Sequence, residues 1–323
     1  MMPTLIVFDG HMMDHLIELT DEQLLTLHVD PACEYLGLSA QEWDVLAQAT
    51  TALCLTPIVR VGGAGANTAR GFARLGGRAV VHGQVGDDEA GRCVIAQLRS
   101  DRCSVQLRTV SGATGRCLVF VRPDGKRVMR SDVGVVLDFD DADSIVLTMV
   151  PRPRILHLTG YLLNPVHPIH HAVRAVMDVA TGEHVAISID IGSAAYLGDK
   201  VVREIVENYA TVMFLNEDEA RQLGLGSPEM AAAELLRWAT VHKRDAIVVV
   251  TRGSQGVLAC RRDEVVNVPA RRVIVRDTTG AGDAFAAGFL FALMQGRPLE
   301  ACARLGCHLA AKTVQVIGGV PDE

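Results

Sequence analysis

Short, almost continuous apolar runs alternate with helical segments along most of this chain. They include "TLIVF" (4–8), "VAISIDI" (185–191), "TVMFL" (211–215) and "DAIVVV" (245–250). Strands that are apolar on both sides need cover on both faces, and helices between the strands supply it. The sequence therefore predicts an α/β fold with a mostly parallel central sheet flanked by helices.

The segments between these runs complete the expected order of elements. A Gly pair follows "NTARGFARL" and is typical of the end of a helix. We expect helices from Asn67, over 88–101, near 168–181 and near 199–208. We also expect strands over 78–85, 154–158 and 272–276 and a hairpin near 257–268.

Two segments do not follow this alternation. Residues 14–60 hold many acidic residues and Arg60 as their one Lys or Arg, so we expect a partly helical insertion. Residues 105–131 alternate in polarity and contain Pro123-Asp124-Gly125, which favours a turn between antiparallel strands. Parts of 14–60 and 105–132 are therefore predicted to form a small β-rich lid.

The lid region is rich in positive charge. Arg and Lys outnumber acidic residues over 99–130, which ends in "RPDGKRVMR". Two interpretations are open: these side chains form a solvated face, or some of them close over an anionic substrate.

Composition excludes several classes of protein. The net charge of −7 argues against binding to nucleic acid or to an anionic membrane. No run of apolar residues is long enough to span a bilayer. The eight cysteines form no C-x-x-C pair, which indicates reduced thiols and a cytoplasmic location rather than a zinc site or disulfides.

The segment "DTTGAGDAFAAGFL" (277–290) places glycines and one carboxylate at the start of a helix. Free N–H groups at a helix start attract anions, and glycine lets the backbone approach a phosphate closely. Gly280, Ala281 and Gly282 therefore suit an anion hole. Asp283 would repel a phosphate, but it could take a proton from an attacking hydroxyl group. The alternative is that Asp283 only caps the helix.

A second glycine-rich segment, "GGAGANTARGFARLGG" (62–77), also lies between an expected strand and a helix. It departs from the dinucleotide fingerprint because Thr68 stands at the third glycine position, so a dinucleotide-dependent oxidoreductase is a weak alternative. The chain contains no G-x-x-x-x-G-K-[ST], which excludes a P-loop enzyme.

Together the two segments resemble the two signature stretches of the PfkB (ribokinase-like) family of sugar and nucleoside kinases. "VGDDEAG" (85–91), "NEDEA" (216–220) and "TRGSQG" (251–256) lie between them in the family's order. The resemblance implies one Rossmann-like, ribokinase-like domain over 1–323. It also implies transfer of the γ-phosphoryl group of ATP to a hydroxyl group, with Mg²⁺.

The resemblance further assigns residues to roles. Asp283 would be the base, with Gly280, Ala281 and Gly282 as the anion hole. Nucleotide contacts are expected at Thr251, Gly253, Gly256, Asn216 and Cys307. Asn216 and Glu219 would hold Mg²⁺ through water, and Asp277 and Thr279 a monovalent cation such as K⁺. The acceptor would contact Asp14, Gly62, Gly63, Asn67 and Asp9.

The acceptor itself is left open. The spacing from Asp14 to Gly62 is long for a ribokinase and favours adenosine-kinase-like members, hence a nucleoside. Asp9 stands where relatives usually have glycine, as a turn residue or as an extra hydroxyl contact. The alternatives are a sugar phosphate held by lid arginines and a catalytically silent regulator. Some relatives form homodimers through lid strands.

Overall fold

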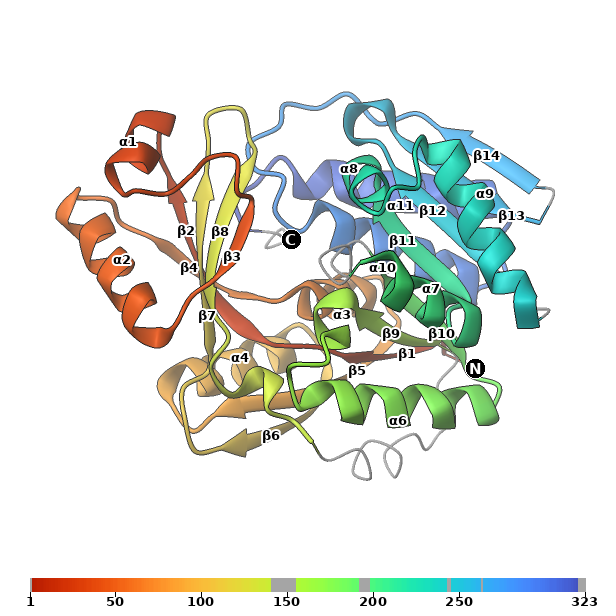
Figure 1. The fold of residues 1–323 in the computed structure, drawn as a ribbon, viewed down its shortest axis with the longest axis horizontal. Coiled ribbons are helices and arrows are strands. Elements are labelled where there is room, and N and C mark those ends of the chain that lie inside the picture. The colour runs from red at the N-terminus through yellow and green to blue at the C-terminus, as the bar shows by residue number, and fades with distance from the viewer. Residues whose placement is uncertain (1, 141–154, 192–197, 243–244, 263, 319–323) are drawn as a thin grey trace.

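The computed structural model describes residues 2–140, 155–191, 198–242, 245–262 and 264–318 (Figure 1). A nine-stranded sheet has the order β14-β13-β12-β11-β10-β9-β1-β5-β6. Its pairs from β12 to β6 are parallel, and β13 and β14 add an antiparallel edge. The strands are β1 (Thr4–Phe8), β5 (Arg78–Gly86), β6 (Ser104–Val110), β9 (Ile155–Thr159), β10 (Ala186–Asp190), β11 (Val212–Asn216), β12 (Ile247–Thr251), β13 (Val257–Arg261) and β14 (Glu264–Val268).

Helices cover both faces of this sheet, as the apolar strands require. One buried cluster joins the sheet to α6 (Ile169–Gly182), α7 (Asp199–Asn208) and α9 (Pro228–Ala239). The other joins it to α3 (Ala64–Arg74), α4 (Glu89–Ser100), α10 (Ala281–Met294) and α11 (Leu299–Thr313). The shorter elements are α8 (Glu217–Gln222) and the 3₁₀ turns η1 (Gly134–Leu137), η2 (Gly160–Leu163), η4 (Thr240–His242) and η5 (Gly253–Gln255). Among the described helices, none has the length and apolar character needed to cross a membrane.

A separate five-stranded sheet forms the lid, in the order β3-β8-β7-β2-β4. Its strands are β2 (Met12–Glu18), β3 (Tyr35–Gly37), β4 (Ile58–Gly62), β7 (Gly115–Val121) and β8 (Arg127–Asp132). The helices α1 (Asp21–Thr26) and α2 (Ala40–Ala52) lie beside it at the left of Figure 1. Leu24 and Trp43 from these helices pack against Leu118, Phe120 and Val128. The acidic insertion therefore supplies the apolar cover of one lid face.

The structure corrects three local expectations. Residues 104–110 form β6, which pairs parallel with β5 in the large sheet, so the antiparallel lid strands of this region are only β7 and β8. The predicted strand at 272–276 is coil, and Ile274 there is 84% exposed. Helix α3 begins at Ala64 rather than Asn67, because Gly63 ends the strand and serves as N-cap.

The basic lid segment is mostly paired with the acidic insertion. Arg116 lies 2.7 Å from Asp44, and Arg122 lies 2.7 Å from Asp21. Arg130 is buried and donates to the carbonyl oxygens of Cys33 and Asp30. Because exposed ion pairs are weak, these contacts orient the lid helices more than they stabilise them.

We predict that Trp43→Ala destabilises the lid. Trp43 is 5% exposed and packs on the lid sheet, with the Arg116 guanidinium 4.0 Å from its ring centre. Loss of a buried aromatic side chain costs about 3–5 kcal/mol, which urea denaturation measures. The control is Val45→Ala on the same helix, where Val45 is 61% exposed; equal effects of the two substitutions would contradict the packing.

Candidate active site

One cavity of about 1460 Å³ opens between the lid and the carboxyl ends of the large sheet. Strand ends of the large sheet contribute Asp9, Asp190, Asn216 and Thr251 to its lining. This is where parallel α/β sheets bind ligands, because the strands end there and the helices begin. The lid contributes Asp14, Cys117, Arg127, Met129 and Ser131.

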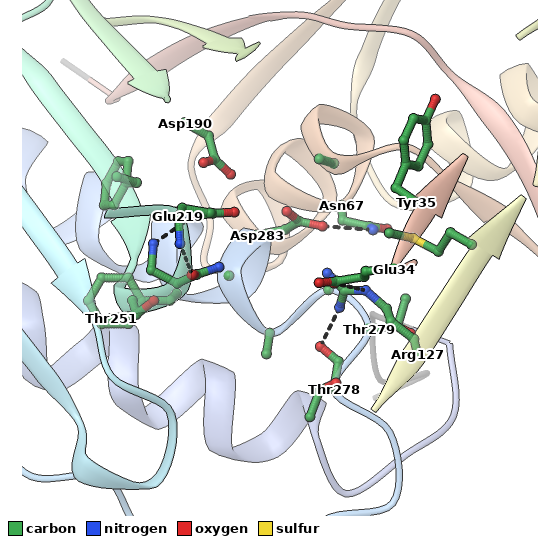
Figure 2. Close-up of a pocket in the computed structure, with 18 of the residues that line it drawn as sticks. Glu34, Tyr35, Asn67, Arg127, Asp190, Glu219, Thr251, Thr278, Thr279 and Asp283 are labelled. Carbon is green, nitrogen blue, oxygen red and sulfur yellow. Dashed lines mark hydrogen bonds and ion pairs between the residues drawn. The ribbon is translucent and has the colours of Figure 1, made fainter. Parts of the chain in front are cut away.

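Asp283 lies in the first turn of α10 and faces this cavity (Figure 2). The N-cap residue Gly280 has left-handed backbone (φ 73°), and no side chain caps the helix. The Ala281 N–H donates to the Thr278 carbonyl oxygen at 3.2 Å, which leaves the N–H groups that follow it in the first turn of α10 available to an anion in the cavity. Asn67 from α3 donates its Nδ2 hydrogen to Oδ2 of Asp283 at 3.0 Å. The two glycine-rich segments thus meet at one carboxylate.

The surroundings of Asp283 suit it to proton transfer. Burial raises the pKa of Asp283 to about 7; the Asn67 hydrogen bond and the Arg127 charge oppose the rise, while Asp9 and Asp14 add to it. A carboxylate with a pKa near neutrality can accept a proton and release it again at physiological pH. Helix capping alone does not account for this environment.

The lid is bonded directly to the turn that precedes α10. Arg127 of β8 donates from Nη1 to the carbonyl oxygen of Thr278 at 2.9 Å (Figure 2). The Thr278 hydroxyl and backbone N–H both donate to the carbonyl oxygen of Gly125, at the tip of the β7–β8 hairpin. Movement of the lid would therefore act on the anion-binding turn through Thr278.

The predicted acceptor residues gather on the lid side of the cavity. Asp14 lies across Gly62, where an added Cβ would come within 2.1 Å of the Asp14 carboxyl carbon. Burial raises the pKa of Asp14 to about 7. Asp14, Gly63 and Asn67 line the cavity. Asp9 also borders it, but its side chain is held by other groups and is only 3% exposed.

The predicted nucleotide residues lie on the opposite side. Thr251, Gly253, Gly256 and Cys307 line the same cavity as Asp283. The coil at 270–276 adds Arg271, Arg272, Val273 and Val275 to the lining.

Asn216 and Glu219 form a reciprocal capping box at the start of α8. Oδ1 of Asn216 accepts from the N–H groups of Asp218 and Glu219, and Glu219 accepts from the N–H of Asn216 at 2.6 Å. Burial, followed by the charge of Asp190, raises the pKa of Glu219 to about 8. Asp190 and Glu219 thus bring two carboxylates toward one part of the cavity (Figure 2).

These carboxylates fit a hard cation that keeps much of its water. Mg²⁺ usually takes one or two protein carboxylates together with substrate phosphates. Among the described residues, no group of three or more His, Cys, Asp or Glu could hold a metal ion. The donor set therefore suits water-mediated Mg²⁺ rather than a fully protein-bound metal.

Asp277 and Thr279 lie behind the anion-binding turn. Asp277 is fully buried and accepts from the N–H groups of Thr279 (2.8 Å) and Gly318 (3.0 Å). The Thr279 hydroxyl oxygen is buried without a hydrogen-bond partner among the described residues. These bonds fasten the turn to the loop after α11, and the unpartnered hydroxyl leaves one oxygen available as a ligand.

Residues 36–322 match the pfkB family of carbohydrate kinases. The chain belongs to this family. An uncharacterized sugar kinase of Archaeoglobus fulgidus is 31% identical over 77% of this chain and 96% of its own length. A fructokinase of Klebsiella pneumoniae is 30% identical over 72% of this chain and 76% of its own. An adenosine kinase structure from Sinorhizobium meliloti matches with a TM-score of 0.89, at 25% identity, over 100% of this chain and 97% of that one.

Membership fixes the class of reaction. This pfkB-family chain is a phosphotransferase that moves a phosphoryl group from ATP to a hydroxyl group of a sugar or nucleoside. The ribokinase-like fold is confirmed. The dinucleotide-dependent oxidoreductase is thereby excluded, and Gly63 and Gly65 begin a helix of the kinase site instead.

Sequence reasoning did not assign four residues of this kinase cavity. Asp190 ends the strand "VAISIDI", and a carboxylate at the end of a buried parallel strand was a usable signal. Arg127 was one basic residue among many. Tyr35 and Tyr161 come from β3 and η2, and their rings lie 5.6 Å apart in the cavity wall. Nothing in the sequence indicated that these two segments meet.

We predict that Asn67→Ala shifts the acid limb of the kcat–pH profile upward. Loss of the Asn67 hydrogen bond removes an effect that lowers the pKa of Asp283, so the base stays protonated to higher pH. A hydrogen bond to a charged group corresponds to about one pH unit. Steady-state kinetics with ATP and an accepted sugar or nucleoside measure the limb.

Thr68→Val is the control for this shift. Thr68 lies next to Asn67 on α3, and its hydroxyl reaches only the backbone oxygen of Asp283, at 3.4 Å. The acid limb of this variant should stay in place. An Asn67→Ala limb that is unmoved or lower would contradict the proposed interaction.

Proposed function

We propose that the protein is a nucleoside kinase in which Asp283 is the general base. The observation that carries the proposal is the Asp283 carboxylate: its pKa lies at about 7, it faces the cavity, and it stands at the uncapped start of α10. A base and an anion-binding helix start are both needed where a hydroxyl group attacks a phosphoryl group.

Each part of the turn then has a task. Asp283 takes the proton from the acceptor hydroxyl as that oxygen attacks. The N–H groups of Gly280 and Gly282 stabilise the negative charge that develops on the phosphoryl group, while the Ala281 N–H between them donates to the Thr278 carbonyl oxygen. Asn67 orients Asp283 through its 3.0 Å hydrogen bond, and Asp14 receives other hydroxyl groups of the acceptor.

We assign roles in the same way to the residues on the nucleotide side of the cavity. Thr251, Gly253, Gly256, Asn216 and Cys307 would contact ATP. Glu219 and Asn216, joined by Asp190, would hold Mg²⁺ through water, and the bound ion supplies charge neutralisation to the phosphates. The Thr279 hydroxyl, which has no hydrogen-bond partner in the described part of the chain, supports a monovalent cation beside Asp277, such as K⁺.

Two aromatic rings support a nucleoside as the acceptor. Tyr35 from the lid and Tyr161 from the large domain line the cavity and contact each other at 5.6 Å. Aromatic rings stack well on planar bases. The adenosine kinase from Sinorhizobium meliloti is similar over the whole chain, which agrees with this choice.

A sugar phosphate is the second candidate. Arg116 and Arg130 are bonded to residues of the insertion and lie outside the cavity lining, which argues against their binding a phosphate. Arg122, Lys126 and Arg127 line the cavity, and Arg122 is paired with Asp21. Phosphorylated sugars in the screen below test this alternative.

A homodimer through lid strands stays a prediction. Helices α1 and α2 pack on one face of the lid sheet, which leaves its edge strands β3 and β4 for such a contact. Ile58 and Val59 on β4 are 43% and 48% exposed. Sedimentation of the full chain measures the state directly.

We predict that Asp283→Asn lowers kcat by at least about 100-fold, because the amide cannot accept the proton and general bases contribute this much. ADP release is measured across nucleosides, pentoses, hexoses and their phosphates, with this variant as the blank. Circular dichroism verifies that the fold is kept. Near-normal turnover by Asp283→Asn would show that Asp283 is not the base. Turnover of sugar phosphates alone would favour a sugar-phosphate kinase.

We predict that Tyr161→Ala raises the KM for a nucleoside by about tenfold or more, because stacking on an aromatic ring is worth about 1–3 kcal/mol per base. The KM for ATP should stay near the wild-type value, since the Tyr161 ring lies 5.6 Å from that of Tyr35, and Figure 2 shows Tyr35 on the other side of Asp283 from Thr251. An unchanged nucleoside KM would contradict base stacking at this ring.

A further inference from the structure

Asp9 is a buried carboxylate at the point where the chain leaves the large sheet for the lid. It follows β1 and precedes β2, and it is 3% exposed. Its Oδ2 accepts from the backbone N–H of Gly65 at 2.5 Å, and its Oδ1 accepts from the Thr159 hydroxyl at 2.7 Å. Both oxygens are therefore engaged inside the protein.

The bond to Gly65 replaces a cap that helix α3 lacks. The N-cap residue of α3 is Gly63, which has no side chain to bond the first N–H groups. Asp9 provides that acceptor from the turn after β1. Gly65 admits the carboxylate, because an added Cβ there would lie 2.5 Å from the Cβ of Asp9.

The same helix turn carries the side chain that holds the base. Asn67 lies two residues after Gly65, and its backbone N–H donates to the carbonyl oxygen of Gly63 at 3.0 Å. Its side chain donates to Asp283 at 3.0 Å (Figure 2). A continuous set of bonds thus runs from Asp9 through the first turn of α3 to Asp283.

We propose that Asp9 is a positioning residue: by capping α3 from outside the helix it fixes Asn67, and through Asn67 the orientation of Asp283. The inference rests on the proposed function, in which Asp283 is the base. Each oxygen of Asp9 already accepts a bond from the protein and the residue is only 3% exposed, which favours a positioning role over direct contact with the acceptor. It is a feature of this chain at a position where glycine is the expected residue.

Two substitutions at Asp9 test whether its two hydrogen bonds are what the enzyme needs. In Asp9→Asn, the amide oxygen can still accept from Gly65, and the amide NH₂ can donate to the Thr159 hydroxyl, which then serves as acceptor. Asp9→Ala removes both bonds. We expect Asp9→Ala to lower kcat by about tenfold to 100-fold, as small misplacements of catalytic groups do, and Asp9→Asn to restore most of it.

A double-mutant cycle tests the route through Asn67. With adenosine as the acceptor probe, or D-fructose if adenosine is not phosphorylated, kcat is measured for Asp9→Ala, Asn67→Ala and the double variant. If Asp9 acts through Asn67, Asp9→Ala should change kcat of the Asn67→Ala enzyme by less than about twofold. Multiplying effects, or a change confined to the KM of the acceptor, would overturn the proposal and favour direct contact.

Hydrogen exchange gives a readout that needs no turnover. Amides of residues 63–67 should exchange faster in Asp9→Ala than in wild type, and near the wild-type rate in Asp9→Asn and Asn67→Ala. Ser227→Ala is the matched control, since it removes the N-cap of the distant helix α9 and should leave kcat unchanged. Unaltered exchange in Asp9→Ala overturns the inference, whereas wild-type enzyme without kinase turnover would instead reject the proposed function.

Discussion

The hydrogen bond between Asn67 and Asp283 is the contact on which the site depends. It joins the first turns of α3 and α10, which lie 216 residues apart in the chain. Each helix begins at a glycine without a side-chain cap, so both present free N–H groups toward neighbouring groups. At α3 the carboxylate of Asp9 occupies this position, whereas at α10 we propose that it is left for the phosphoryl group. An uncapped helix start thus has a structural role in α3 and, in our proposal, a catalytic role in α10.

The lid closes one side of the cavity, and most of its charged side chains already have partners within the protein. Arg116 of β7 and Arg122 just after it pair with acids of the insertion, and α1 and α2 cover one face of the lid sheet. Arg127 of β8 lies 3.8 Å from Glu34 of the insertion, and it also reaches down to the Thr278 carbonyl oxygen and lines the cavity. The hairpin tip at Gly125 is bonded to the same threonine. The lid and the anion-binding turn are therefore joined by direct hydrogen bonds in this structure.

The sequence predicted the large sheet well because its strands are apolar on both sides and several of the covering helices, such as α3 and α7, are amphipathic. It failed at 272–276, where an apolar run is coil on the cavity rim, and at β6, whose alternating pattern belongs to an edge strand of the large sheet. Glycine-rich motifs indicated Asp283 and Asn67 correctly as neighbours of the cavity. Asp190 could have been found from its place at the end of a buried strand. Arg127, Tyr35 and Tyr161 required knowledge of which distant segments meet, and no local pattern contains it.

The central claim is that Asp283 is a carboxylate adapted to proton transfer at neutral pH. Its pKa can be measured directly by NMR titration of the side-chain carboxyl carbon in ¹³C-labelled protein, with the signal assigned from the Asp283→Asn spectrum. The account predicts a midpoint at about 7. A midpoint near the ordinary aspartate value of about 4 would contradict it, because such a group would be a weak base for a hydroxyl proton.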